Sequence, residues 1–75
     1  MKQKSLEDVL IENEINPSTI DFLRGYLAGK PKRWTRIMIL RCQGYTQKAI
    51  GEELRMSRSG VARVLGKIRK KIDVT

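Results

Sequence analysis

The segment between Gly44 and Ile72 constrains the fold of this 75-residue chain more than any other feature. Apolar residues recur there at helical spacing in two stretches that are separated by a short turn. The first stretch contains Ala49, Ile50 and Leu54, and the second contains Val61, Val64, Leu65, Ile68 and Ile72. Thr46 and Ser57 stand just ahead of the two stretches, where a hydroxyl side chain caps a helix N-terminus. The pattern predicts one helix from Thr46 to about Leu54, a tight turn, and a second helix over residues 58–72.

The N-terminal part of the chain contains two further helix starts. Ser5 and Asp8 form a start that resembles a capping box, and apolar residues follow at helical spacing. Asn16 and Pro17 then combine an N-cap residue with a proline at the first helical position. These signals predict two short helices before residue 30.

Residues in the middle of the chain predict a buried central helix and the signals that separate it from the helix before it. We expect Gly29 to cap the second helix and Pro31 to follow it as a stop. A third helix, roughly from Trp34 to Gln43, contains four consecutive apolar residues and should be the buried centre of the domain. Trp34 is expected to close the edge of a small core. Residues 1–75 are therefore predicted to be a single all-α domain, a compact bundle of about five short helices.

Positive charge is concentrated in the C-terminal part of the chain. Residues 1–29 contain three basic and five acidic residues, which gives a net charge of −2. Residues 30–75 contain 13 basic and three acidic residues, which gives a net charge of +10. A cationic surface that served only solubility would not predict this division. A polyanionic partner such as nucleic acid does predict it.

The composition argues against several other classes of protein. One cysteine and no histidine disfavour a disulfide framework and a zinc site. No apolar run reaches the roughly 18 residues of a membrane-spanning helix, and the N-terminus resembles neither a secretory signal nor a transit peptide. Cys42 is expected to be a buried small hydrophobe. We expect a cytoplasmic, nucleoid-associated protein that is not an enzyme and needs no metal, cofactor or small-molecule ligand.

Residues 46–65 resemble the helix-turn-helix of LuxR-type regulators and of region four of sigma factors. The shared pattern is roughly T-x-K-E-I-A-x-x-L-x-I-S-x-x-T-V, followed by a basic helix. The matching residues are Thr46, Lys48, Ile50, Gly51, Leu54, Met56, Ser57 and Val61. The resemblance implies a DNA-binding unit whose second helix enters the major groove.

Two positions of this segment carry structural expectations. Gly51 takes the small-residue position where the two helices meet. Arg55 departs from the pattern, because this turn position often holds glycine and a left-handed backbone is costly for a residue with a Cβ. The turn therefore either has another geometry or is strained.

Helical position assigns the candidate contacts with DNA. Base edges are within reach of the first two turns of the second helix, where we expect base contacts from Arg58, Ser59, Ala62 and Arg63. Phosphate contacts are expected at the start of the first helix, where free amides suit an anion, and from the cations further along the second helix. These candidates are Thr46, Gln47, Lys48, Ser57, Lys67, Arg69 and Lys70.

The apolar stripe of the first helix has two open interpretations. It is formed by Leu6, Val9, Leu10, Ile11 and Ile15. The stripe is either a homodimer interface or a cover for the core of its own domain. A dimer would present two recognition helices to half-sites about 34–36 Å apart.

These features favour a sequence-specific transcriptional regulator that binds double-stranded DNA. Residues 1–29 form its acidic helical part, which could serve dimerisation, and residues 30–75 form its basic DNA-binding part. A chain without a sensor domain suits a small repressor or autorepressor of a plasmid, a phage or a small operon. Two alternatives stay open: an adaptor that binds RNA polymerase, and a DNA-targeting subunit of a recombination or packaging complex.

Overall fold

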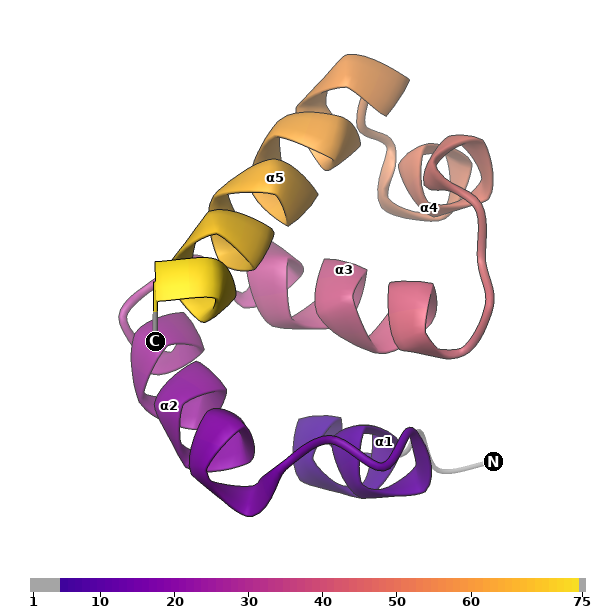
Figure 1. The fold of residues 1–75 in the computed structure, drawn as a ribbon. Helices are drawn as coiled ribbons and strands as arrows, with labels where there is room; N and C mark the ends of the chain where they lie inside the picture. Colours follow the sequence, from indigo (N-terminus) through magenta and orange to yellow (C-terminus); the bar gives the residue numbers. More distant parts are fainter. Residues whose placement is uncertain (1–4, 75) are drawn as a thin grey trace.

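Five helices make up the part of the chain that the structure describes (Figure 1). The computed structural model describes the backbone of residues 5–74 and the side chains of residues 5–72. The helices are α1 (Leu6–Glu12), α2 (Pro17–Ala28), α3 (Lys32–Cys42), α4 (Gln47–Leu54) and α5 (Arg58–Val74). No strand occurs in residues 5–74. The structure therefore confirms the predicted all-α fold.

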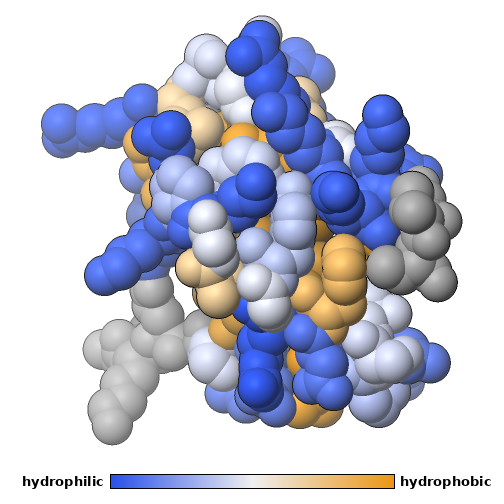
Figure 2. Space-filling view, turned by 90° about the vertical axis from the view of Figure 1, so that its left-hand side faces the viewer, coloured by the Kyte–Doolittle hydropathy of each residue, from blue (hydrophilic) through white to orange (hydrophobic). Residues whose placement is uncertain are grey.

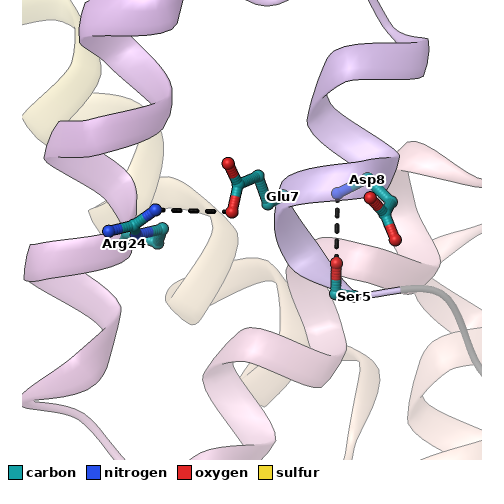
Figure 3. Close-up of polar contacts among 4 residues, drawn as sticks. All are labelled: Ser5, Glu7, Asp8 and Arg24. Carbon is teal, nitrogen blue, oxygen red and sulfur yellow. Dashed lines mark hydrogen bonds and ion pairs between the residues drawn. The ribbon is translucent and has the colours of Figure 1, made fainter.

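Polar side chains cap the starts of four helices, as the sequence predicts. The residues that accept a hydrogen bond from a backbone amide of the following helix are Ser5, Asn16, Thr46 and Ser57. In α1 the bond joins Ser5 Oγ to the amide nitrogen of Asp8 at 3.2 Å (Figure 3). Each cap provides a partner for an amide that has none within its own helix.

The start of α3 differs from the sequence prediction. The helix begins at Lys32, before Trp34, and Pro31 occupies its N-cap position. The carbonyl of Pro31 accepts the amide N–H of Trp34 at 3.0 Å. A proline fits this position because its fixed φ suits a helix start and no amide is needed from it. Pro31 therefore begins α3 in addition to following α2, which Gly29 caps as predicted.

Helix α3 lies at the centre of the fold, between α1 on one side and α4 and α5 on the other (Figure 1). Ile37 and Leu40 are buried, while Met38 and Ile39 are half-buried, because four consecutive apolar residues surround most of a helix. The buried apolar side chains are Leu6, Val9, Leu10, Ile20, Leu23, Leu27, Ile37, Leu40, Ile50, Val61, Val64 and Ile68. Trp34 packs half-buried against this core, which confirms its predicted place at an edge. Within residues 5–74, no helix has the length and apolar character needed to cross a membrane.

Helix α1 packs onto its own domain, which corrects the interpretation of its apolar stripe as a dimer interface. Leu6, Val9 and Leu10 are each at most 9% exposed, and Ile15 packs half-buried against the core. Only Ile11 of the five predicted interface residues is exposed, at 58%. The stripe therefore covers the domain's own core, because a side chain that is already buried offers no surface to a second copy.

An exposed ion pair also joins α1 to α2. The Nη1 atom of Arg24 lies 3.3 Å from Oε2 of Glu7 (Figure 3). Both side chains are half or more exposed, so the pair contributes no more than about 1 kcal/mol to stability. The packing of the two helices rests mainly on their buried apolar side chains.

Candidate nucleic-acid interface

A short turn, residues 55–57, sets α5 against α4. Arg55 has φ 56° and ψ 45°, which is the left-handed conformation. The sequence leaves open whether this turn has another geometry or is strained. The structure shows that Arg55 adopts the left-handed conformation that glycine usually takes, so the turn is strained at this residue. The amide of Met56 donates to the carbonyl of Gly51 at 2.8 Å, and Ser57 Oγ then accepts the amide N–H of Gly60 at 3.0 Å. These two bonds fix the end of α4 and the start of α5.

Gly51 lets the turn fold back closely onto α4. Its residue position is buried, and a Cβ added there would lie 2.7 Å from the carbonyl oxygen of Met56. A side chain at this point would push the turn, and α5 with it, away from α4. This confirms the predicted small-residue position where the two helices meet.

The N-terminus of α4 opens onto a hollow of about 440 Å³. Its lining residues are Arg41, Thr46, Gln47, Lys48 and Arg58, which come from α3, α4, α5 and the residue before α4. Three candidates for phosphate contact thus lie beside Arg58, a candidate for base contact. The described lining contains three cations and no carboxylate, so the potential of the hollow is positive and suits an anion.

Arg41 is held at this hollow by a hydrogen bond to the loop before α4. Its Nη1 atom donates to the carbonyl of Tyr45 at 3.0 Å. This contact keeps the guanidinium close to Thr46, whose Oγ1 accepts the amide N–H of Ala49 at 3.1 Å. The arginine and the capped first turn of α4 therefore form one cationic corner.

A second hollow, of about 340 Å³, continues along α5. Arg41 and Gln47 line both hollows, so the two form one continuous surface. The remaining lining residues of the second hollow are Met38, Ala62, Leu65, Gly66, Ile68, Arg69 and Ile72. Ala62 and Arg69, candidates for base and phosphate contact, thus lie on the same side of α5 as Arg58.

Ser59 and Arg63 lie on α5 outside both hollows. Both residues are exposed, and four positions apart they share one face of the helix. The helical rotation places this face roughly opposite the buried Val61 and Ile68. The four candidates for base contact therefore occupy two neighbouring faces of α5 rather than one.

Lys67 and Lys70 belong to a different surface from Arg69. Together with Tyr26 and Lys71 they line a hollow of about 230 Å³ where α5 passes α2. The cations that the sequence assigns to phosphates are therefore divided between two sides of α5. Hydrophilic side chains project from much of the face seen in Figure 2, with apolar areas exposed between them.

Cys42, the residue after Arg41, is half-buried and packs against the core. Burial raises the pKa of its thiol above the ordinary value, and the positive charge of Arg41 offsets this rise only in part. A thiol with a raised pKa is a weak nucleophile at neutral pH. Its surroundings are those of a packing residue that retains some exposure.

Two residues that line these hollows, Arg41 and Tyr26, are not predicted by any sequence pattern. An interpretation of α3 as one buried helix overlooks Arg41, although its position in the last turn of α3 places it within reach of the following loop. For Tyr26 no local signal exists, because its neighbours on α5 lie more than 40 residues away in the sequence.

Comparisons of the chain with protein family models, with curated proteins and with solved structures found no match. The central observation is the cationic corner where α3, α4 and α5 meet.

Proposed function

We propose that this protein is a transcriptional regulator that binds double-stranded DNA at specific sequences. In this proposal α4 and α5 form a helix-turn-helix, and α5 enters the major groove. The observation that carries it is the convergence of Arg41, Lys48 and Arg58 on one open hollow at the N-terminus of α4. A helix N-terminus surrounded by cations suits a backbone phosphate. Helix α5 begins at the same hollow, so its exposed side chains would lie beside the bases next to that phosphate.

Phosphate binding is assigned to the corner between α3 and α4. Because Thr46 Oγ1 caps the amide of Ala49, the amides of Gln47 and Lys48 are the ones left free for a phosphate oxygen. Arg41 and the Lys48 ammonium add charge-assisted contacts, which position the protein without reading sequence.

Base reading is assigned to the first two turns of α5. Arg58 can bind O6 and N7 of guanine with its planar fork, and Ala62 can contact a thymine methyl group. Ser59 and Arg63 extend the contact on the adjoining face. Contacts made through two faces fit a helix that lies within the groove, with DNA on both of its sides.

The proposal extends to a small repressor, or autorepressor, that acts in the nucleoid as a homodimer without catalysis or cofactor. The molecule measures 31 × 31 × 20 Å. Two copies that pack along one of the long axes could hold their α5 helices close to one DNA turn apart, about 34–36 Å. Their interface would lie elsewhere than on the buried residues of α1.

One observation favours a second candidate function, an adaptor for RNA polymerase or a DNA-targeting subunit of a recombination or packaging complex. Ile11 is 58% exposed on α1, and its exposed neighbours on this helix include Glu7, Asp8 and Glu12. An apolar side chain within an acidic surface suits contact with another protein. In this alternative α1 binds the partner and α5 contacts DNA.

Fluorescence anisotropy across a salt series tests the main proposal. The probes are a duplex from upstream of the protein's own coding sequence and a scrambled duplex of equal composition. We expect Arg58→Ala to lower the preference for the upstream duplex by about 1–3 kcal/mol, through loss of a base contact. Arg41→Ala should weaken both duplexes equally and reduce the salt slope by about one.

Arg24→Ala is the matched control, since Arg24 is an exposed arginine on α2 whose ion pair is weak. It should change neither preference nor salt slope. Binding of both duplexes with equal affinity by the wild type would contradict sequence-specific regulation. Capture of purified RNA polymerase without DNA, lost on Ile11→Asp but kept by Arg58→Ala, would instead support the adaptor.

A further inference from the structure

Two lysine ammonium groups lie against aromatic rings on the side of α5 away from the cationic corner. Lys30 Nζ lies 5.2 Å from the ring centroid of Tyr26 and 5.3 Å from that of Trp34. Lys67 Nζ lies 6.0 Å from the ring centroid of Trp34. One indole ring therefore contacts cations from the α2–α3 connection and from α5.

The rings that hold these ammonium groups are themselves fixed. Tyr26 and Trp34 pack edge to face, with centroids 6.4 Å apart and an angle of 65°. Both are half-buried against the core, and Phe22 stacks on Tyr26 at 6.0 Å. Cation–π attraction thus restricts Lys30 and Lys67 before any ligand arrives. A lysine that is already restricted loses less rotamer entropy when it binds an anion.

Lys70 and Lys71 add two further cations to the same place. They line the hollow beside Tyr26 together with Lys67, and the described lining includes no carboxylate. Lys71 lies in the last turn of α5, where the negative end of the helix dipole stabilises its positive charge. Lys67 lies a full turn earlier, where the dipole gives little help. The repulsion within this group of cations is relieved by a polyanion.

We propose that Lys30, Lys67, Lys70 and Lys71 form a phosphate clamp for the DNA backbone. The inference rests on the proposed function and adds to it a second, sequence-independent contact with the same duplex. Lys67 and Lys70 lie 9 and 12 residues beyond Arg58, which is about 14 and 18 Å along α5. Since the major groove is about 12 Å wide, this distance carries them from the base edges to the strand that borders the groove.

The chemistry of the clamp selects phosphates over bases. The faces of Tyr26 and Trp34 hold ammonium groups, and both rings pack half-buried against the core. Stacking of a nucleobase would have to displace these lysines. The clamp therefore neutralises backbone charge and contributes equally to every sequence.

Trp34 is the only tryptophan of the chain, so its emission reports directly on the clamp. We expect saturable change in Trp34 emission when a 20-base-pair duplex is added, at the concentrations where anisotropy reports binding. Lys67→Gln with Lys70→Gln should lower the slope of log K against log salt by about 0.9 for each lysine. The ratio of affinities for the upstream and scrambled duplexes should stay unchanged. Lys32→Gln, an exposed lysine outside the hollow, is the control and should leave the slope as it is.

The outcomes separate the clamp from the proposed function. If Arg58→Ala removes sequence preference while the double lysine variant keeps the wild-type slope, the regulator stands and the clamp is wrong. If anisotropy detects no binding of either duplex, both proposals fail. A change in Trp34 emission with phosphatidylglycerol vesicles or with inorganic phosphate, but not with duplex, would assign the cluster to another anion and overturn the clamp. Circular dichroism confirms that each variant is folded.

Discussion

Glu14 and Gly44 occupy equivalent positions in the loops that follow α1 and α3, thirty positions apart in the sequence. Both have positive φ, 58° for Glu14 and 96° for Gly44. In each loop the next residue donates its amide to the carbonyl five positions before it, at 3.1 Å. This is a helix ending that glycine favours, because glycine has no Cβ to clash in a left-handed backbone. Glutamate carries the strain of the same ending in the first loop.

Exchange at these two positions should change stability in opposite directions. We expect Glu14→Gly to raise the free energy of unfolding by up to about 1 kcal/mol, since it removes left-handed strain. Gly44→Ala should lower it by about 1 kcal/mol or more for the converse reason. Urea denaturation followed by circular dichroism measures both. An unchanged midpoint for Glu14→Gly would mean that its side chain compensates for the strain.

The contact between Gly51 and the turn gives a sharper test of the α4–α5 geometry. Gly51→Ala should cost about 1–3 kcal/mol, because its Cβ meets the backbone carbonyl of Met56 and not a movable side chain. Gly25→Ala in α2 is the control, since nothing lies within 4 Å of its added Cβ. The free energy of unfolding of this control should rise by about 0.5–1 kcal/mol, because alanine stabilises a helix relative to glycine. Equal effects on the urea midpoint would show that the turn yields.

Neighbouring residues of α1 should differ widely in their contribution to stability. Leu10 is fully buried, whereas Ile11 is 58% exposed. Leu10→Ala should therefore cost about 2–5 kcal/mol, and Ile11→Ala should stay within about 0.5 kcal/mol of the wild type. Thermal and urea denaturation at several protein concentrations provide the measurement. A large, concentration-dependent cost of Ile11→Ala would reveal an interface on α1 after all.

Cys42 should make stability depend on alkaline pH. Burial raises the pKa of its thiol in the folded protein, so the unfolded chain loses this proton first as the pH rises. The contribution of the neutral buried thiol is complete below the ordinary thiol pKa, about 8.5, and is lost as the pH rises through the folded pKa. The wild type should therefore lose stability relative to Cys42→Ala as the pH rises from the ordinary thiol pKa towards the higher pKa of the thiol in the folded protein. If the free energy of unfolding depends on pH in the same way for both proteins, the thiol of Cys42 does not have a raised pKa in the folded state.

Local signals in the sequence are sufficient for the presence of the five helices and for the small residue at the α4–α5 turn, but not for the first residue of α3 or for the backbone conformation of Arg55. Ser5, Asn16 and Thr46 cap helices because each cap is a contact between residues only two or three positions apart. The requirement for glycine at Gly51 is likewise local, since it concerns the next turn of the chain. Such features need no knowledge of how the helices pack.

The partners of each helix face depend on packing and cannot be read locally. An apolar stripe on α1 shows that something covers Leu10, but both α3 and a second copy would satisfy the same pattern. Lys67 and Arg69 are only two positions apart, and helical rotation alone directs them to different sides of α5. Trp34 lies beside Lys67 because α3 packs against α5. No local sequence pattern predicts this contact between two helices.

The position of α3 between acidic α1 and basic α5 has an electrical consequence (Figure 1). With net charges of −2 on residues 1–29 and +10 on residues 30–75, the molecule carries a permanent dipole moment as well as a net charge. In the field of a polyanion this moment exerts a torque, which turns the α5 side forward while the two bodies are still a Debye length apart. The protein is thereby oriented before it reaches the polyanion, and fewer encounters occur through its acidic end. Raising the ionic strength shortens the range of this torque, so the rate of association should fall with salt before the contacts themselves weaken.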